Sequence, residues 1–287
     1  MGSIAVDASS IYCTGDGLVG DTSGGTIMRV SKTGGDPVVL VSKQDEPGSI
    51  AVDDKNIYWV TTTNLMKAAL DGKDVTRLVA SQDILSDVTL DASNVYFTAV
   101  PKTRSNAGKV LKLPKTGGRP VTLASAQNDP GSLALESGAL YWTGRAQIWK
   151  LPLAGGAPAV LVSSEPDLTD MAVDSANVYW MTWTHTNSTL TIKQMPLSGG
   201  APRVLVSRAD SYSGILTVAG RYVYWTTRYD EVNRTPVGGG PTEVLNTETM
   251  YFDAFDLAVD DSSVYWTDFA IWNMQHSTIA RVMRAPR

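Results

Sequence analysis

The residue types that most directly suggest chemistry are the two histidines of the chain, His185 and His276. Two carboxylates, Asp268 and Asp230, are expected to lie near them in the fold. Two imidazoles with carboxylates can bind a transition metal, and a single imidazole can act as a general base. The alternative is that both histidines are solvated. His276, His185 and Asp268 are thus the candidate catalytic residues; no cofactor is expected, with a divalent metal as the alternative.

A denser group of aromatic and polar residues lies near the end of the chain. Aromatic rings stack on sugars, and carboxylates and amides hydrogen-bond to them, so this composition favours a glycan or another small polar ligand. In the alternative interpretation the aromatic residues only seal the opening of the fold. The residues predicted to bind the ligand are Trp272, Asn273, Gln275, His276, Tyr251, Phe252, Asp253, Asp16, Asp21 and Trp183.

Five aspartates recur at equivalent positions of a repeated pattern, at Asp7, Asp53, Asp91, Asp174 and Asp260. They could be metal ligands arranged in a ring. However, each ends an apolar run and is followed by turn-forming residues, and a short carboxylate can accept hydrogen bonds from the backbone amides of a tight turn. The pattern therefore favours a structural role for these acids, and no metal ligand is predicted.

These aspartates belong to a unit that occurs seven times and centres on a tyrosine followed by a second residue that is usually aromatic. The pairs are Tyr12-Cys13, Tyr58-Trp59, Tyr96-Phe97, Tyr141-Trp142, Tyr179-Trp180, Tyr224-Trp225 and Tyr265-Trp266. The apolar run always ends five residues before the tyrosine. Each unit holds short segments rich in Val, Ile, Tyr, Trp and Thr, separated by turn residues, which is typical of β-strands.

A unit of about 40 residues with four strands is typical of a β-propeller blade. We name the strands A, B, C and D; in the first unit they are predicted at 3–6, 10–14, 26–30 and 37–41. The sequence predicts an all-β, seven-bladed propeller with antiparallel four-stranded blades, a last blade of three strands, and almost no helix. It predicts one domain, 1–287, with repeats at about 3–42, 49–80, 87–125, 132–163, 170–207, 214–246 and 256–287.

The pleat of a strand places the tyrosine and its neighbour on opposite faces of each blade, where both can fill the space between blades. Cys13 occupies a tryptophan position and is predicted to be a small buried residue rather than a nucleophile. The glycine pairs, such as Gly34-Gly35, are predicted to form C–D hairpin turns, because no helix follows them to make a phosphate site.

The units differ mainly in the length of their connections. Odd units have a long B–C connection and even units a short one; the long segments are 15–25, 99–109, 183–191 and 268–278. The D–A segment 246–256 is also enlarged. In antiparallel blades these connections share one end, and insertions in repeat proteins often collect on a binding face. A ring of seven units makes the last unit a neighbour of the first, so we predict the site there.

The repeat resembles the YWTD-type propeller repeat of lipoprotein-receptor ectodomains and, more loosely, the NHL-type propellers and the bacterial lyase and lactonase propellers. The resemblance covers the whole chain at the level of one blade pattern, and the full tetrad occurs once, at Tyr265-Trp266-Thr267-Asp268. It implies a propeller fold. The receptor family usually has six blades flanked by cysteine-rich modules, and this chain departs from both features, so the resemblance does not imply receptor function.

Composition narrows the partner classes. The net charge is −5 and the pI about 5.1, which argues against a nucleic-acid partner, and no apolar run is long enough to span a membrane. A single cysteine excludes an internal disulfide. No signal peptide precedes the first repeat. Low lysine content and many Thr, Ser, Gly and Trp residues favour an extracellular or periplasmic location, and we expect a monomer.

Three functions compete at this point. The first is a non-enzymatic module on the B–C and D–A face, which binds a small polar ligand, a glycan or a protein partner. The second is a metal-assisted lyase or hydrolase that uses His276 or His185 as a base. The third is a structural or sensory domain of a larger protein. The variable aromatic and polar connections on a regular framework favour the first.

Overall fold

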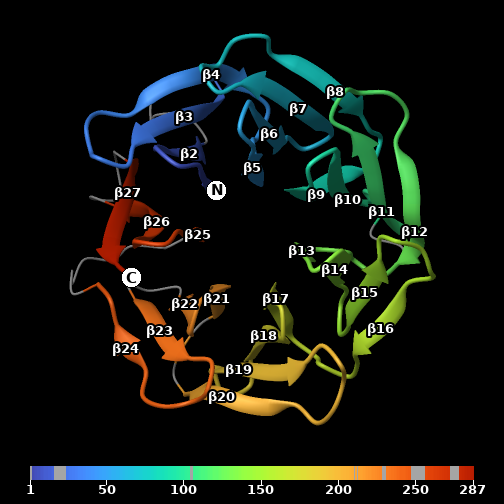
Figure 1. Cartoon of the computed structure of the whole chain (residues 1–287), viewed down its shortest axis with the longest axis vertical. Coiled ribbons are helices and arrows are strands. Elements are labelled where there is room, and N and C mark those ends of the chain that lie inside the picture. Colours follow the sequence, from blue (N-terminus) through green and yellow to red (C-terminus); the bar gives the residue numbers. More distant parts are fainter. Residues whose placement is uncertain are drawn as a thin grey trace. The chain divides into compact units, whose positions relative to one another are not determined.

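The computed structural model of the chain describes residues 2–15, 24–103, 106–209, 211, 213–227, 231–246, 256–271 and 278–287. Within these ranges the chain forms strands and no helix, and the strands assemble into seven antiparallel sheets in sequence order (Figure 1). The chain is thus a seven-bladed β-propeller, as predicted. Six blades have four strands, and the seventh has three within the described residues.

The described residues divide into two compact parts, and the first contains blades one to three. Blade one consists of β1 (Ile4–Val6), β2 (Ser10–Gly15), β3 (Gly25–Ser31) and β4 (Val38–Gln44). Blade two consists of β5 (Ile50–Val52), β6 (Asn56–Val60), β7 (Asn64–Ala69) and β8 (Thr76–Ala80). Blade three consists of β9 (Ile84–Leu90), β10 (Asn94–Val100), β11 (Gly108–Pro114) and β12 (Val121–Gln127).

The second compact part contains nearly all of the remaining blades. Blade four consists of β13 (Leu133–Glu136), β14 (Ala139–Thr143), β15 (Ile148–Pro152) and β16 (Ala159–Val162). Blade five consists of β17 (Leu168–Val173), β18 (Asn177–Thr184), β19 (Thr189–Pro196) and β20 (Arg203–Arg208). Blade six consists of β21 (Ser213–Ala219), β22 (Tyr222–Thr227), β23 (Val232–Pro236) and β24 (Glu243–Val244), and blade seven of β25 (Asp256–Val259), β26 (Ser263–Ile271) and β27 (Thr278–Pro286).

The tyrosine of one blade packs against the aromatic residue of the next blade. Tyr179 of blade five shares a buried cluster with Trp225 of blade six, and Tyr58 of blade two shares one with Phe97 of blade three. The seven repeat tyrosines and four of the tryptophans (Trp59, Trp142, Trp180 and Trp225) are less than 2% exposed. The predicted placement of the pair on opposite faces is confirmed. Burial of such rings contributes about 1.5–3 kcal/mol each.

The recurring aspartates close the A–B turns. In blade three, Asp91 Oδ1 accepts the backbone amides of Ser93 and Asn94, at 2.7 and 2.6 Å, while Oδ2 accepts the Tyr96 hydroxyl at 2.6 Å. The same tyrosine–aspartate bond joins Tyr12 to Asp7, Tyr179 to Asp174 and Tyr265 to Asp260. The structural interpretation of these acids is confirmed, and the constant five-residue offset brings the hydroxyl to the carboxylate.

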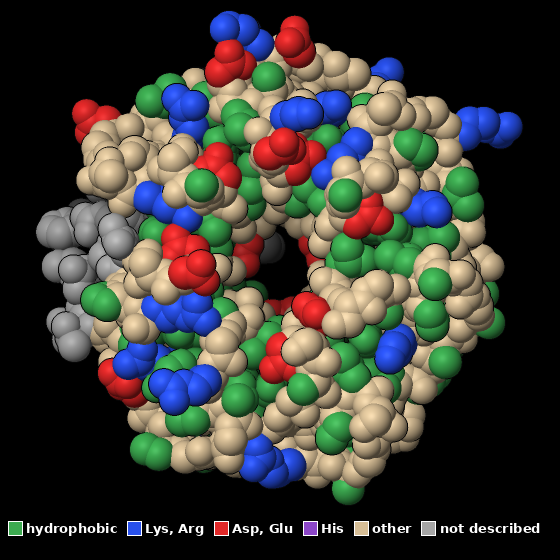
Figure 2. Space-filling model, in the orientation of Figure 1, with side chains coloured by type: hydrophobic (Ala, Val, Ile, Leu, Met, Phe, Trp, Pro, Cys, Tyr) green, Lys and Arg blue, Asp and Glu red, His purple; other side chains and the backbone are tan. Residues whose placement is uncertain are grey.

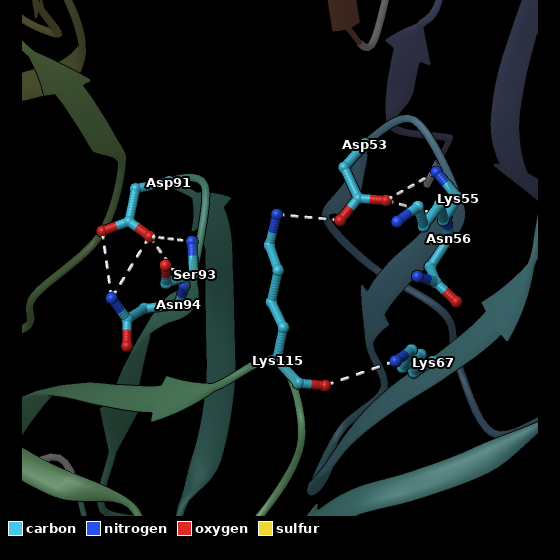
Figure 3. A network of polar contacts seen from close by, with 8 residues as sticks. All are labelled: Asp53, Lys55, Asn56, Lys67, Asp91, Ser93, Asn94 and Lys115. Atoms are coloured by element: carbon cyan, nitrogen blue, oxygen red, sulfur yellow. Dashed lines mark hydrogen bonds and ion pairs between the residues drawn. The ribbon is translucent and has the colours of Figure 1, made fainter.

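Blade two uses the same turn differently (Figure 3). Asp53 Oδ1 accepts the amides of Lys55 and Asn56, but Oδ2 pairs with Lys115 Nζ at 2.8 Å, from the C–D turn of blade three. Lys67 Nζ donates to the Lys115 carbonyl at 3.2 Å, and both ammonium groups lie 5.7 Å from the centre of the Tyr58 ring. These contacts tie blade two to blade three by charge and cation–π attraction.

A further set of acids joins the A strands of successive blades. Asp87 Oδ2 accepts the amide of Leu133 in blade four at 2.6 Å, and its Oδ1 accepts the hydroxyl of Ser49 in blade two. Asp170 of blade five accepts the amide of Leu216 in blade six in the same way, at 2.8 Å. Desolvation raises the pKa of the Asp87 carboxyl group. Side chains therefore join blades that the β-ladders do not connect.

The odd-numbered and even-numbered blades differ in their turn residues and in the length of their B–C connections. The aspartates with a tyrosine partner belong to odd blades, at intervals of 84, 83 and 86 residues, whereas the corresponding residues in blades two, four and six are Asp53, Glu136 and Ala219. The odd blades also have the longer B–C connections. A two-blade unit of about 83 residues is therefore a better description of the chain than a one-blade unit.

The predicted strands of blade one agree with the observed ones to within three residues. The larger difference concerns the connections predicted to be long loops. In blade five, β18 and β19 extend through most of 183–191, so that Trp183 lies in a strand and only 185–188 form the turn. Asp268 likewise lies in β26 rather than in a loop. The extra residues of these units lengthen the B–C hairpin because their Thr- and aromatic-rich segments continue the ladder.

Candidate functional site

Most of the predicted ligand-binding residues lie outside the part of the chain that the structure describes. These are Asp16, Asp21, Tyr251, Phe252, Asp253, Trp272, Asn273, Gln275 and His276. Asp230, which enters only the alternative of a metal site, also lies outside the described residues. For Asp268 only its place in β26 is described. The site predicted between the last and first units therefore remains a prediction. Trp183 and His185 are described, and they lie in blade five.

Trp183 and His185 belong to the junction between blades five and six. Trp183 pairs with Leu190, which pairs with Arg208, so these three residues form one row across β18, β19 and β20. Paired residues point to the same face of a sheet. Leu190 packs in a cluster with Leu216, Val223 and Trp225, which shows that this face is turned toward blade six.

The Trp183 ring is held in place from two sides. Its indole Nε1 donates to the carbonyl of Ser211, in the connection between blades five and six, at 2.7 Å. The imidazole of His185 lies 4.0 Å from the indole, centroid to centroid, at an interplanar angle of 60°. Trp183 is half-buried and His185 is exposed. The two rings make an angled aromatic surface at the B–C end of the blade.

An ion pair lies at the same junction. Both Nη atoms of Arg208 donate to the two carboxylate oxygens of Glu231 in blade six, and the longer of the two distances is 3.2 Å. The hydrogen bond from Arg208 lowers the pKa of Glu231 below its ordinary value. The two side chains are 42% and 30% exposed. A bidentate, partly desolvated pair of this kind holds its geometry better than an isolated surface ion pair does.

Asn233 lies deeper in the junction. It follows Glu231 by two residues and therefore projects from β23 toward the same side, toward blade five. Asn233 is fully buried, and among the described residues neither end of its amide makes a hydrogen bond of ordinary geometry. Its amide still contributes to the lowered pKa of Glu231. A buried amide is normally hydrogen-bonded, so the amide of Asn233 has donors and an acceptor that the described residues do not use.

The term 5–6 junction is used below for Trp183, His185, Arg208, Ser211, Glu231 and Asn233. Of these six, the sequence prediction included Trp183 and His185 and missed the other four. The charged pair could not be found from spacing alone, since Arg208 and Glu231 come from different repeats.

Metal binding has no support among the described residues, since no group of three or more His, Cys, Asp or Glu side chains there could hold an ion. The imidazole of His185 lies against the indole of Trp183. On the face of the molecule shown in Figure 2, acidic and basic side chains are interspersed. No helix of the described part is long and apolar enough to cross a membrane.

Comparison with known proteins gives a match only at the level of structure. No family model matches the chain, and no curated protein matches its sequence. Solved structures of several β-propellers do match. The β-propeller domain of the Trilobed protease from Pyrococcus furiosus, described as having an open velcro topology, matches with a TM-score of 0.72 at 8% identity, over 99% of this chain and 96% of that one.

Two further matches differ in what their proteins do. An oligogalacturonate lyase in complex with manganese matches with a TM-score of 0.71 at 10% identity, over 97% of this chain and 86% of that one. A chain of the nidogen/laminin complex matches with a TM-score of 0.59 at 16% identity, over 76% of this chain and 89% of that one. At such identities the likeness shows the β-propeller fold alone. The resemblance to YWTD-type repeats is supported to the same extent.

Proposed function

We propose that this chain is a non-enzymatic binding module that recognises a polar organic ligand, a glycan or a protein partner at the B–C and D–A end of its blades. The observation that carries the proposal is the 5–6 junction, where the half-buried Trp183 and the exposed His185 lie at the same blade junction as an interblade ion pair. Aromatic surface with a few oriented polar groups is the usual composition of a recognition site.

The chemistry of the framework supports the same proposal. The recurring aspartates accept hydrogen bonds from turn amides and pair with tyrosine hydroxyls or with Lys115. Asp87 and Asp170 accept hydrogen bonds from backbone amides of the next blade. The repeat residues therefore serve the fold. The residues that differ between repeats lie mainly at the B–C and D–A end, and variable connections on a regular framework commonly carry function.

The test introduces the same change, threonine to arginine, at each of the two ends of the blades. Thr186 is exposed in the β18–β19 turn, and Thr116 is exposed in the β11–β12 turn at the opposite end. A glycan array and a metabolite panel are screened with the purified chain, and the strongest binder is titrated against Thr186→Arg and Thr116→Arg. We expect Thr186→Arg to weaken binding and Thr116→Arg to leave it unchanged. The reverse order, or the absence of any binder together with measured turnover, would overturn the proposal.

The second candidate is a metal-assisted lyase or hydrolase with His276 or His185 as base. The observation that favours it is the structural match with the manganese-bound oligogalacturonate lyase over nearly the whole chain. The measurement is the metal content of the purified protein and its cleavage of oligogalacturonate with added manganese. Cleavage that is lost in His276→Ala or His185→Ala supports this candidate, and a metal-free protein that leaves the substrate intact excludes it.

A further inference from the structure

The A–B turn of blade two has the same backbone as that of blade three. The amide of Asp53 donates to the carbonyl of Asn56 at 3.0 Å, and in blade three the amide of Asp91 donates to the carbonyl of Asn94 at 3.1 Å. In both blades a tyrosine follows the acid after five residues. The turn of blade two therefore allows Asp53 to accept the hydroxyl of Tyr58, as the acids of the odd blades accept theirs.

The Tyr58 hydroxyl nevertheless lacks this bond. It is buried, and among the described residues it makes no hydrogen bond of ordinary geometry. Lys115, from the C–D turn of blade three, takes the position of the hydroxyl, with its Nζ 2.8 Å from Asp53 Oδ2 (Figure 3). Burial raises the pKa of Tyr58, and the charge of Asp53 raises it further. The displaced hydroxyl thus remains within electrostatic reach of the carboxylate that it does not bind.

Two donors therefore compete for one carboxylate oxygen. Burial would raise the pKa of Asp53, but hydrogen bonds from Lys115 and the turn amides hold it below its ordinary value, so the carboxylate is ionised at neutral pH. A bond between two charged groups is roughly twice as strong as a bond between neutral groups. The side chains of Lys115 and Asp53 are only 15% and 16% exposed, so water and salt screen their attraction little. The charged donor accordingly displaces the hydroxyl.

Only one atom of the turn has to change partner for the hydroxyl to return. Asp53 Oδ1 accepts the amides of Lys55 and Asn56, at 2.9 and 2.8 Å, and these bonds do not involve Lys115. The odd blades show that one carboxylate can serve the turn amides and a tyrosine at the same time. The turn therefore has two complete arrangements, which differ in the partner of Oδ2.

We infer that the Asp53 carboxylate is a two-position switch set by the charge of Lys115. While that charge is present, Oδ2 binds Lys115 and ties blade two to the C–D turn of blade three. When the charge is removed, Oδ2 binds the Tyr58 hydroxyl, and the acid then serves blade two alone. The device lies at the A–B and C–D end of the blades, so the inference is independent of the proposed function.

The first experiment measures the coupling between Tyr58 and Lys115. Tyr58→Phe is made in the native chain, in Lys115→Met, which removes the charge, and in Lys115→Arg, which keeps it, and each chain is unfolded in urea at pH 7. In the native chain and in Lys115→Arg, we expect the phenylalanine to change the unfolding constant by less than about twofold. In Lys115→Met it should raise that constant about fivefold or more, because it then removes a hydrogen bond.

Two results of this cycle would overturn the switch. The first is an equal effect of Tyr58→Phe in the native chain and in Lys115→Met. The second needs no lysine variant, and so stands even if Lys115→Met does not fold. If Tyr58→Phe in the native chain raises the unfolding constant as much as Tyr96→Phe does, the Tyr58 hydroxyl is already bonded and has no partner to gain.

The second experiment locates the hydrogen bond directly. In a crystal structure of Lys115→Met, we expect the Tyr58 hydroxyl to lie 2.6–2.9 Å from Asp53 Oδ2, the range seen for this bond in the odd blades. Lys67 is the competing donor, since its Nζ already reaches the Lys115 carbonyl at 3.2 Å. An ion pair between Lys67 and Asp53, or a hydroxyl still without a partner, would show that the tyrosine is not the second position.

Discussion

At the scale of single residues, the bond between the repeat tyrosine and the turn aspartate explains why the sequence spacing is constant. The aspartate needs its two oxygens for different tasks, because one accepts two turn amides and the other accepts the hydroxyl five residues later. Burial would raise the pKa of Asp91, yet the bonds from Tyr96 and from the turn outweigh it and hold that pKa below its ordinary value. Because the pKa of Asp91 is lower in the folded protein, its ionised form stabilises the fold at pH values above the ordinary Asp pKa. This contribution is lost as the pH falls through the lowered pKa.

This bond can be tested with a matched pair of tyrosines. Tyr96→Phe removes the hydroxyl donor to Asp91 and should lower the free energy of unfolding by about 1 kcal/mol. Tyr224 is the control, because Ala219 stands in blade six where the other blades have an acid. The buried hydroxyl of Tyr224 has no hydrogen-bond partner among the described residues. Tyr224→Phe should change stability by less than about 0.5 kcal/mol. Urea unfolding of both variants gives the comparison, and equal losses would contradict the role assigned to the bond.

Residue types alone predicted the turn acids but not their second partner. The five-residue offset was visible in the sequence, whereas the pairing needs the A–B turn to fold the strands back on each other. The 5–6 junction shows the same limit more strongly, because Arg208 and Glu231 lie in different blades and their contact depends on how successive sheets pack.

At the scale of strands and connections, two glycines fix how blades one and three join the next blade. Gly25 and Gly108 begin the C strands β3 and β11, and the carbonyls of Gln44 and Gln127 lie 3.1 and 2.9 Å from where a Cβ would be. The connections turn sharply here, with left-handed backbone at Glu46 and Asp129, at φ values of 45° and 48°. Any side chain at these glycines must displace the proline behind it, which is Pro47 or Pro130.

Gly108→Ala should therefore destabilise the protein by about 1–3 kcal/mol, as overpacking of a tight contact does. The matched control is Gly238→Ala in the C–D turn of blade six, where a Cβ would meet no atom within 4 Å. We expect the melting temperature to fall for Gly108→Ala and to stay within about a degree or two for Gly238→Ala. Similar melting temperatures would show that the connection can move away from the strand.

The order of the strands was predictable from turn residues and apolar runs, and their bounds in blade one agree closely with the observed ones. The long connections were harder to predict, since a Thr- and aromatic-rich segment can continue a β-ladder or leave it. Whether Trp183 lies in a loop or a strand depends on cross-strand pairing with Leu190, which single-chain periodicity does not show.

At the scale of the whole molecule, the fold is a series of blades in which each blade is stabilised by the next. The buried clusters join blades one and two, two and three, four and five, five and six, and six and seven. Each includes the tyrosine of one blade and an aromatic residue of the next. Because a blade alone would expose both faces of its sheet, opening one blade removes contacts from its neighbours.

Cys13 reports on this cooperativity, since it is the only cysteine of the chain and is 4% exposed in β2 of blade one. Burial raises the pKa of its thiol to about 12, and alkylation requires the thiolate, so the folded blade should protect it. We expect iodoacetamide to label Cys13 only while blade one is open, and urea below the unfolding midpoint to accelerate labelling in proportion to the unfolded fraction. Thr186→Cys, in the exposed β18–β19 turn, supplies the unprotected rate in the same chain. If labelling of Cys13 depends much less on urea than global unfolding does, blade one opens without its neighbours. The interblade contacts then stabilise each junction separately rather than the whole molecule at once.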